Sequence, residues 1–149
     1  MLLPCIPMAV FAETGTVIAT GDFDATTGLT WTVYDGTTLV ISKTGDGTGA
    51  MPDYTGTNDK PWEAYRTTIT SAVIGDGITY IGARSFQECT ALKTVTMADS
   101  VTSMGAYVFN ADGALEAVKL SENLEQIPNG TFNGASALKA LEIPYNTGI

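Results

Sequence analysis

The residues that most often carry out catalysis or bind metals are scarce in this chain. Its 149 residues include no histidine and only two cysteines, Cys5 and Cys89. Histidine is the commonest general base and the commonest metal ligand, so the chain lacks the side chain that most often serves in either role. Two cysteines provide neither a disulfide framework nor a cysteine-rich zinc site. Because no histidine is present to activate its thiol, we interpret Cys89 as a packed core residue rather than a nucleophile.

Four aspartates in the N-terminal part of the chain are the next candidates for chemistry. Asp22, Asp24, Asp46 and Asp53 offer the oxygen ligands that calcium prefers, but they lack the spacing and the terminal glutamate of an EF-hand loop. Aspartate in glycine-rich segments commonly forms turns, so turn formation is the favoured interpretation and an extracellular calcium site is the alternative. Segment 44–49 is glycine-rich without the lysine of a phosphate-binding loop, which argues against nucleotide binding.

The charge balance limits the kinds of partner. Sixteen acidic and seven basic residues give a formal net charge of −9, and no cluster of lysine and arginine interrupts the acidic character. Such a chain is repelled by nucleic acid and by anionic membrane surfaces, so we expect neither as a partner. The acidity is interpreted as a device for solubility. A hydrolase that uses paired carboxylates has little support, because no deep site is implied.

A repeat of 23 residues sets the geometry of the second half of the chain. Successive repeats begin at Ile69, Leu92, Leu115 and Leu138, and the fourth is incomplete. A fixed period of this length is typical of a solenoid, in which each coil buries its apolar face against the next. The expected inward columns are Ile69, Leu92, Leu115 and Leu138; Ala72, Val95, Val118 and Leu141; Ile74, Met97, Leu120 and Ile143; Ile78, Val101 and Leu124; Ile81, Met104 and Ile127; and Phe86, Phe109 and Phe132.

Short strands are expected at the same place in each repeat. Segments 94–97, 117–120 and 140–143 alternate apolar and polar residues, which predicts half-buried strands stacked in parallel. A second extended piece is expected at 101–104, followed by a turn or helical fragment at 105–109. The outward residues of the strands are the candidate binding face, because their small and hydroxyl side chains suit a broad protein or glycan surface. These candidates are Ser71, Val73, Thr94, Thr96, Ala117, Lys119, Ala140 and Glu142. The alternative is that they are ordinary solvent-facing residues.

The part of the chain before the repeat has no such period. Residues 1–12 form an uncharged apolar run that resembles the end of a truncated secretory signal, although a first buried strand is the alternative. The run is too short to span a bilayer, so no membrane insertion of the mature chain is expected. Residues 13–66 are predicted to form a β-rich cap. Within it, alternation at 29–34, Asp35-Gly36 and the run 39–42 predict a β-hairpin.

The cap is expected to cover the open end of the solenoid. That end exposes an apolar cross-section and unpaired strand groups, which must be covered. A proline before a short aromatic segment predicts one helical turn beginning at Trp62. Trp31, Trp62 and Tyr65 are the candidates to pack against the first repeat. The solenoid itself is assigned to residues 67–149.

These motifs resemble the BspA-type leucine-rich repeat of bacterial surface proteins. The first repeat matches that family's pattern through Val73-Ile74, Ile78-Thr79, Ile81-Gly82, Phe86 and Cys89, and the second matches through Leu92, Val95, Met97, Val101-Thr102, Gly105 and Phe109. Ile143-Pro144 and the cap segments 29–31, 39–42, 49–54 and 61–62 are also similar. Three positions depart from the pattern: Asp112 and Ala135 replace cysteine, and Pro128 replaces glycine.

The resemblance implies a mainly β leucine-rich-repeat solenoid that is exported and binds other molecules. It implies no catalytic residues and no cofactor. We therefore expect a secreted or cell-surface, non-catalytic module of adhesion type, with an extracellular protein or glycan as partner. The alternative is a recognition or stalk segment of a larger exported protein, which includes the case of an enzyme. The repeat that is incomplete at Ile149 motivates this alternative.

Overall fold

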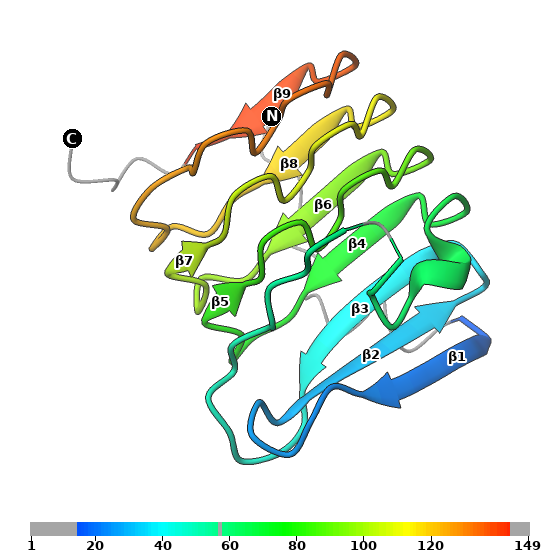
Figure 1. The fold of residues 1–149 in the computed structure, drawn as a ribbon, viewed down its shortest axis with the longest axis vertical. Coiled ribbons are helices and arrows are strands. Elements are labelled where there is room, and N and C mark those ends of the chain that lie inside the picture. Colours follow the sequence, from blue (N-terminus) through cyan, green and yellow to red (C-terminus); the bar gives the residue numbers. More distant parts are fainter. Residues whose placement is uncertain (1–14, 57, 144–149) are drawn as a thin grey trace.

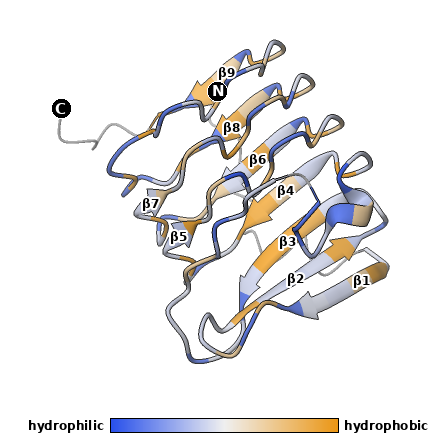
Figure 2. Cartoon of the chain, viewed as in Figure 1, coloured by the Kyte–Doolittle hydropathy of each residue, from blue (hydrophilic) through white to orange (hydrophobic). Residues whose placement is uncertain are grey.

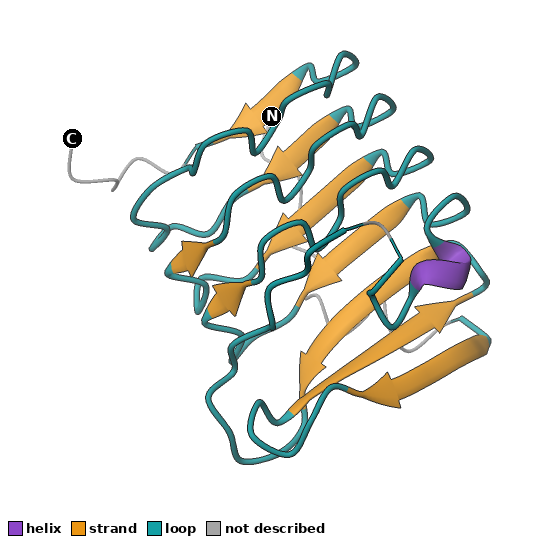
Figure 3. Cartoon of the chain, viewed as in Figure 1, coloured by secondary structure: helices purple, strands orange, loops and turns teal. Residues whose placement is uncertain are grey.

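The computed structural model of the protein describes residues 15–56 and 58–143. Seven strands form one sheet in the order β1-β2-β3-β4-β6-β8-β9, and two short strands, β5 and β7, form a second sheet on the other side of the coils (Figure 1). The only helical element of the described part is a 3-10 turn, η1, at Glu63–Tyr65 (Figure 3). The expectation of a mainly β leucine-rich-repeat solenoid is confirmed. The expected signal segment 1–12 lies outside the described residues.

The cap contains three antiparallel strands rather than the predicted hairpin of two. Strands β2 (Leu29–Tyr34) and β3 (Thr38–Lys43) form that hairpin, and β1 (Val17–Asp22) adds a further strand along β2. Asp35 and Gly36 have φ angles of 53° and 70°, the left-handed conformation that a tight hairpin turn needs. The sequence does not predict strand β1, because a bulge between Val17 and Ala19 interrupts the alternation of inward and outward side chains.

The cap joins the solenoid through a change in strand direction. Strand β3 pairs in parallel with β4 (Ser71–Ile74), which begins the repeating part of the sheet. Parallel pairing then continues through β6 (Thr94–Met97), β8 (Ala117–Lys119) and β9 (Ala140–Glu142), always at an offset of 23 residues. The sheet is therefore continuous from the cap to the last described coil, and Figure 2 shows how its hydrophobic residues run from strand to strand.

The opposite side of the coils is held together by shorter pairings. Strands β5 (Tyr80–Ile81) and β7 (Ser103–Met104) pair in parallel, and the predicted extended piece at 101–104 is found there. The segment that follows, 105–109, forms turns rather than a helix. Gly82 lies where its coil approaches the cap so closely that a Cβ atom would overlap the carbonyl oxygen of Pro52. Glycine is therefore required at this position for steric reasons.

A stack of aromatic rings forms the centre of the core. Trp62 faces Phe86 at a centroid distance of 6.0 Å, Phe86 faces Phe109 at 5.5 Å, and Phe109 faces Phe132 at 5.7 Å. The interplanar angles of 26°, 22° and 12° are those of stacked rings. Trp62 has no exposed surface and directly precedes η1. The predictions of a helical turn beginning at Trp62 and of its packing against the first repeat are confirmed.

Two members of the predicted inward columns are exposed, and three more are half-buried, namely Phe132, Leu138 and Leu141. Ile127 is 41% exposed and Ile143 is 54% exposed, whereas Ile81 and Met97, earlier in the same columns, are buried. A side chain in a solenoid is covered by coils on both sides. Among the described residues, Ile127 and Ile143 have a preceding coil on one side only. The column pattern alone does not distinguish a covered coil from an uncovered one.

Candidate functional site

The predicted binding residues form two straight rows across the outer face of the seven-stranded sheet. Ser71, Thr94, Ala117 and Ala140 are in register with one another, and so are Val73, Thr96, Lys119 and Glu142. On the first three strands a buried residue lies between them, Ala72, Val95 and Val118, and on the last strand the half-buried Leu141 takes this place. Because side chains alternate across a strand, the eight predicted residues all point away from the core. We call these two rows the outer strand face.

The outer strand face combines small side chains with a charged end. Alanine, serine and threonine occupy most of its positions, and Lys119 and Glu142 lie side by side on the last two strands. Thr94, Lys119, Ala140 and Glu142 are exposed, while Ser71, Val73, Thr96 and Ala117 are half-buried. Small side chains on adjacent strands leave a broad and shallow surface. Such a surface has the shape for contact with a large partner rather than for enclosing a small substrate.

The same face continues into the cap, which the sequence did not predict. Val73 is in register with Val40, Val40 with Thr32, and Thr32 with Thr20. The hydroxyls of Thr20 and Thr32 lie 3.0 Å apart, within hydrogen-bond distance. The alternation of threonine with Leu29 and Val33 was the available signal, but it did not reveal that the antiparallel cap strands extend a parallel sheet. The binding role of the eight predicted residues stays a prediction.

Cys89 occupies a closed part of the core. Its side chain has no exposed surface, and burial raises the pKa of its thiol well above the ordinary value. The backbone N–H of Cys89 donates a hydrogen bond of 2.9 Å to Oδ1 of Asp112. A protonated thiol without access to solvent is a poor nucleophile, which agrees with the interpretation of Cys89 as a core residue.

Asp112 is the most unusual ionisable group of the repeats. Its residue is fully buried, and its second oxygen, Oδ2, has no hydrogen-bond partner. Burial raises the pKa of this carboxyl to about 8, although hydrogen bonding from the backbone of Cys89 and the charge of Lys60 act in the opposite direction. The position is closed to solvent, so the raised pKa here reflects packing in the core and gives no general acid that a substrate can reach.

Two of the four aspartates considered for calcium, Asp24 and Asp53, accept hydrogen bonds within the protein. Oδ1 of Asp24 accepts hydrogen bonds from the backbone N–H groups of Thr26 and Thr27 at 2.8 and 3.0 Å, as expected for a turn. Oδ1 of Asp53 accepts from the hydroxyl of Tyr80 and from the backbone N–H of Ala83, both at 2.7 Å. Within residues 15–56 and 58–143, no group of three or more metal-ligating side chains comes together.

Comparison with known proteins places this geometry in a family. The family model described as "BspA type Leucine rich repeat region (6 copies)" matches residues 64–149. No curated protein sequence matches the chain. No helix in the described part of the chain has the length and apolar character needed to cross a membrane.

Two solved leucine-rich-repeat proteins share the fold, and a third gives a weaker match. A leucine-rich repeat protein from Eubacterium ventriosum is 24% identical, with a TM-score of 0.55, over 87% of this chain and 45% of its own. The leucine-rich repeat protein of T. pallidum is 17% identical, with a TM-score of 0.50, over 83% of this chain and 50% of its own. A leucine-rich cell surface protein from Faecalibacterium prausnitzii is 18% identical, with a TM-score of 0.43, over 89% of this chain and 44% of its own.

This chain therefore spans about half the length of the solved proteins that it matches. The 23-residue register, the stacked phenylalanines and the family match over residues 64–149 agree with one another. The chain belongs to the BspA-type leucine-rich repeat family.

Proposed function

We propose that this chain is a non-catalytic binding module of a secreted or cell-surface bacterial protein, and that its outer strand face binds an extracellular protein or glycan. The observation that carries the proposal is the unbroken outer strand face, with two rows in register over four coils. A flat surface of this kind offers many weak contacts to a large partner and no cavity in which a reaction is shielded from water. The export of the chain rests on the family resemblance.

The test is a binding screen followed by substitution on the outer strand face. Purified chain is screened against extracellular-matrix proteins and an array of glycans. For each binder found, Thr96→Arg and Lys119→Glu are compared with Gln126→Arg. Gln126 is exposed, and its repeat position corresponds to Tyr80 and Ser103 of β5 and β7, on the other side of the coils. Thr96→Arg and Lys119→Glu are expected to raise the dissociation constant at least tenfold, which is about 1.4 kcal/mol of binding free energy. Gln126→Arg is expected to leave the affinity unchanged.

Two results would sink the proposal. One is the absence of any binder in the screen, and the other is binding that survives both face variants while Gln126→Arg abolishes it. Turnover of a glycan or peptide by the purified chain would overturn the non-catalytic assignment separately.

A second candidate function is a recognition or stalk segment of a larger exported protein, including an enzyme. It is favoured by the observation that each solved relative is about twice as long as the part matched here. Sequencing the coding region on both sides distinguishes the two candidates. A catalytic or anchoring domain in the same reading frame supports the second candidate, and stop codons close to both ends support the first.

A further inference from the structure

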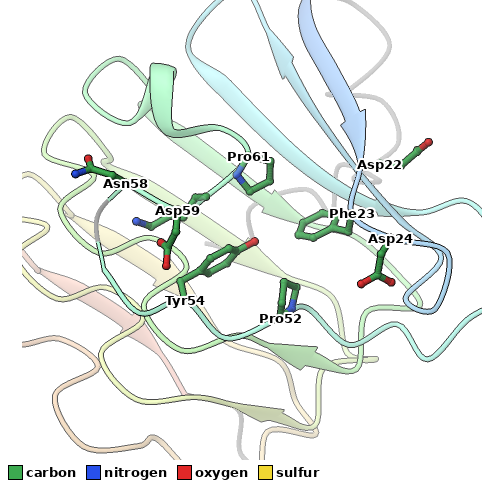
Figure 4. Close-up of a pocket in the computed structure, with 9 residues that line it drawn as sticks. Asp22, Phe23, Asp24, Pro52, Tyr54, Asn58, Asp59 and Pro61 are labelled. Atoms are coloured by element: carbon green, nitrogen blue, oxygen red, sulfur yellow. The ribbon is translucent and has the colours of Figure 1, made fainter.

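A pocket lies in the cap, away from the outer strand face. It forms where the end of β1 meets residues 52–54 and 58–61, and it has a volume of about 350 Å³ (Figure 4). Its lining residues are Asp22, Phe23, Asp24, Pro52, Tyr54, Asn58, Asp59, Lys60 and Pro61. This volume is at the lower end of the range for small-molecule sites. None of these residues belongs to the outer strand face, so the pocket is independent of the function proposed above.

The floor of the pocket holds a polar group that lacks a partner. Tyr54 is only 6% exposed, and its hydroxyl makes no hydrogen bond. Figure 4 shows this hydroxyl pointing into the space between Phe23 and Pro61. Trp62 contacts both Tyr54 and Phe23 edge to face, at 6.0 and 5.8 Å, and its Nε1–H is also without a partner. A buried donor without an acceptor is costly, so a ligand oxygen that reaches it gains a hydrogen bond at a site already desolvated.

The rim of the pocket supplies acceptors. Asp24 and Asp59 are each fixed by a turn: Oδ1 of Asp24 accepts from Thr26, and Oδ2 of Asp59 accepts from Thr55 N–H at 2.7 Å. The pKa of Asp24 is lowered, chiefly by the hydrogen bond from the Thr26 hydroxyl. Burial tends to raise the pKa of Asp59, but the hydrogen bonds from Thr55, from Gly56 and from its own backbone together lower it. Both carboxylates are ionised at neutral pH and accept hydrogen bonds only.

The carboxylate rim and the Tyr54 hydroxyl together favour a ligand that both donates and accepts hydrogen bonds. A carboxylate rim needs donors, and the Tyr54 hydroxyl on the floor needs an acceptor. An ammonium group satisfies the rim but offers no acceptor to Tyr54, and an anion is repelled by the rim. Sugar hydroxyls do both. Phe23, Pro52 and Pro61 provide apolar surface for the C–H face of a sugar ring.

From this arrangement we infer that the cap pocket binds a neutral saccharide unit, whose hydroxyls meet the carboxylates of Asp24 and Asp59 and the phenol of Tyr54. Asn58, with an amide that donates and accepts, lies at the same rim. The site holds one ring, in keeping with the small volume of the pocket. The chain thereby carries a small-molecule site in its cap in addition to a broad face on its strands.

The experiment uses the whole chain and methyl glycosides of neutral hexoses, of N-acetylhexosamines and of a hexuronic acid, with spermidine as a cationic probe. Binding is measured by the shift of the Trp62 indole N–H resonance during titration to about 10 mM, since single-site sugar binding is commonly of millimolar affinity. Tyr54→Phe and Asp24→Asn are the test variants, and the asparagine keeps the oxygen that accepts from Thr26. Thr96→Arg, on the outer strand face, is the matched control.

We expect a neutral glycoside to bind, the hexuronic acid to bind more weakly, and Tyr54→Phe to weaken affinity about tenfold. In the absence of sugar, Tyr54→Phe should melt at the same or a higher temperature, because it removes a hydroxyl that has no partner. Thr96→Arg should bind like the parent chain. Three results would each overturn the inference: no neutral glycoside binds, Tyr54→Phe binds as tightly as the parent, or spermidine alone binds and Asp24→Asn alone weakens it. These outcomes do not depend on the binding screen proposed for the outer strand face, so the two proposals can fail separately.

Discussion

Oδ1 of Asp112 accepts a hydrogen bond of 2.9 Å from the backbone N–H of Cys89, so two residues one repeat apart are joined inside the core. Neither residue has exposed surface. The family pattern places cysteine where Asp112 stands, and the carboxyl oxygen is a stronger hydrogen-bond acceptor than the sulfur of a thiol. The second oxygen of the carboxylate has no partner. This contact connects adjacent coils and at the same time introduces an ionisable group into an apolar environment.

The first prediction concerns the pH dependence of stability. The pKa of Asp112 is raised to about 8 by burial, so between its ordinary value of 3.8 and about 8 the folded chain retains a proton that the unfolded chain releases. The contribution of this group to stability is therefore complete below pH about 4. It decreases as pH rises through this range, by up to about 1.4 kcal/mol per pH unit.

Asp112→Asn tests this directly, because the amide keeps an acceptor for Cys89 and does not ionise. Urea unfolding between pH about 4 and 9 should show the variant becoming more stable than the parent as pH rises, with the difference smallest at acid pH. Glu116→Gln, at an exposed position, is the control and should follow the parent. Parallel curves for the parent and Asp112→Asn would contradict a raised pKa at Asp112.

The second prediction concerns the aromatic stack. Phe109 is fully buried between Phe86 and Phe132, whereas Phe132 is half-buried. Phe109→Ala should lower the free energy of unfolding by about 3–5 kcal/mol. Phe132→Ala should cost clearly less, because solvent already reaches that ring. Thermal unfolding of both variants checks this order. Equal losses of stability would contradict the view that a ring between two coils stabilises the chain more than a ring that is covered on one side.

The third prediction uses two glycines with different surroundings. A methyl group at Gly82 would overlap the carbonyl of Pro52, so Gly82→Ala must move the cap loop and should cost about 1–3 kcal/mol or more. Gly36 has a φ of +70° and no atom within 4 Å of an added Cβ. Gly36→Ala should therefore lower the free energy of unfolding by about 1 kcal/mol, which is the cost of the left-handed backbone conformation alone. Chemical denaturation should rank them in that order, and a milder effect at Gly82 would contradict the close approach.

The fourth prediction concerns the Cys89 thiol. Its burial and raised pKa should make it inert to alkylating reagents in the folded chain. The reaction is measured in a Cys5→Ser variant, so that Cys89 is the one thiol present. The rate should follow unfolding and rise steeply with urea, because the thiol is reached only when the core opens. Rapid labelling without denaturant would show that the core around Cys89 is open.

The sequence predicted the repeating part of the fold in detail because identical backbone positions recur every 23 residues. Segment 94–97 was expected to be a strand and is strand β6 in the structure. Strand β1 was not predicted, since its bulge leaves Val17 and Ile18 about equally exposed, at 52% and 50%. Ile127 was expected to be buried, because a column pattern describes an interior coil and not one covered on a single side.

The cap pocket could not be predicted at all. Its walls come from 22–24, 52–54 and 58–61, and the contact between these segments depends on how the antiparallel cap strands meet the first coil. No periodic signal connects the two segments in the sequence. The unpartnered hydroxyl of Tyr54 is likewise a property of three-dimensional packing, because tyrosine in an aromatic-rich segment usually finds an acceptor.

The ring stack has a consequence for how such a molecule can change in length. Trp62 stacks on Phe86 at nearly the distance at which Phe86 stacks on Phe109. The cap therefore packs against the first coil in the same way as one coil packs against the next. Removal of residues 92–114 as a block would bring Phe86 against Phe132 and β4 beside β8, and would recreate contacts that already exist. Duplication or deletion of one 23-residue unit in the gene can thus alter the height of the array while the cap and its pocket stay unchanged.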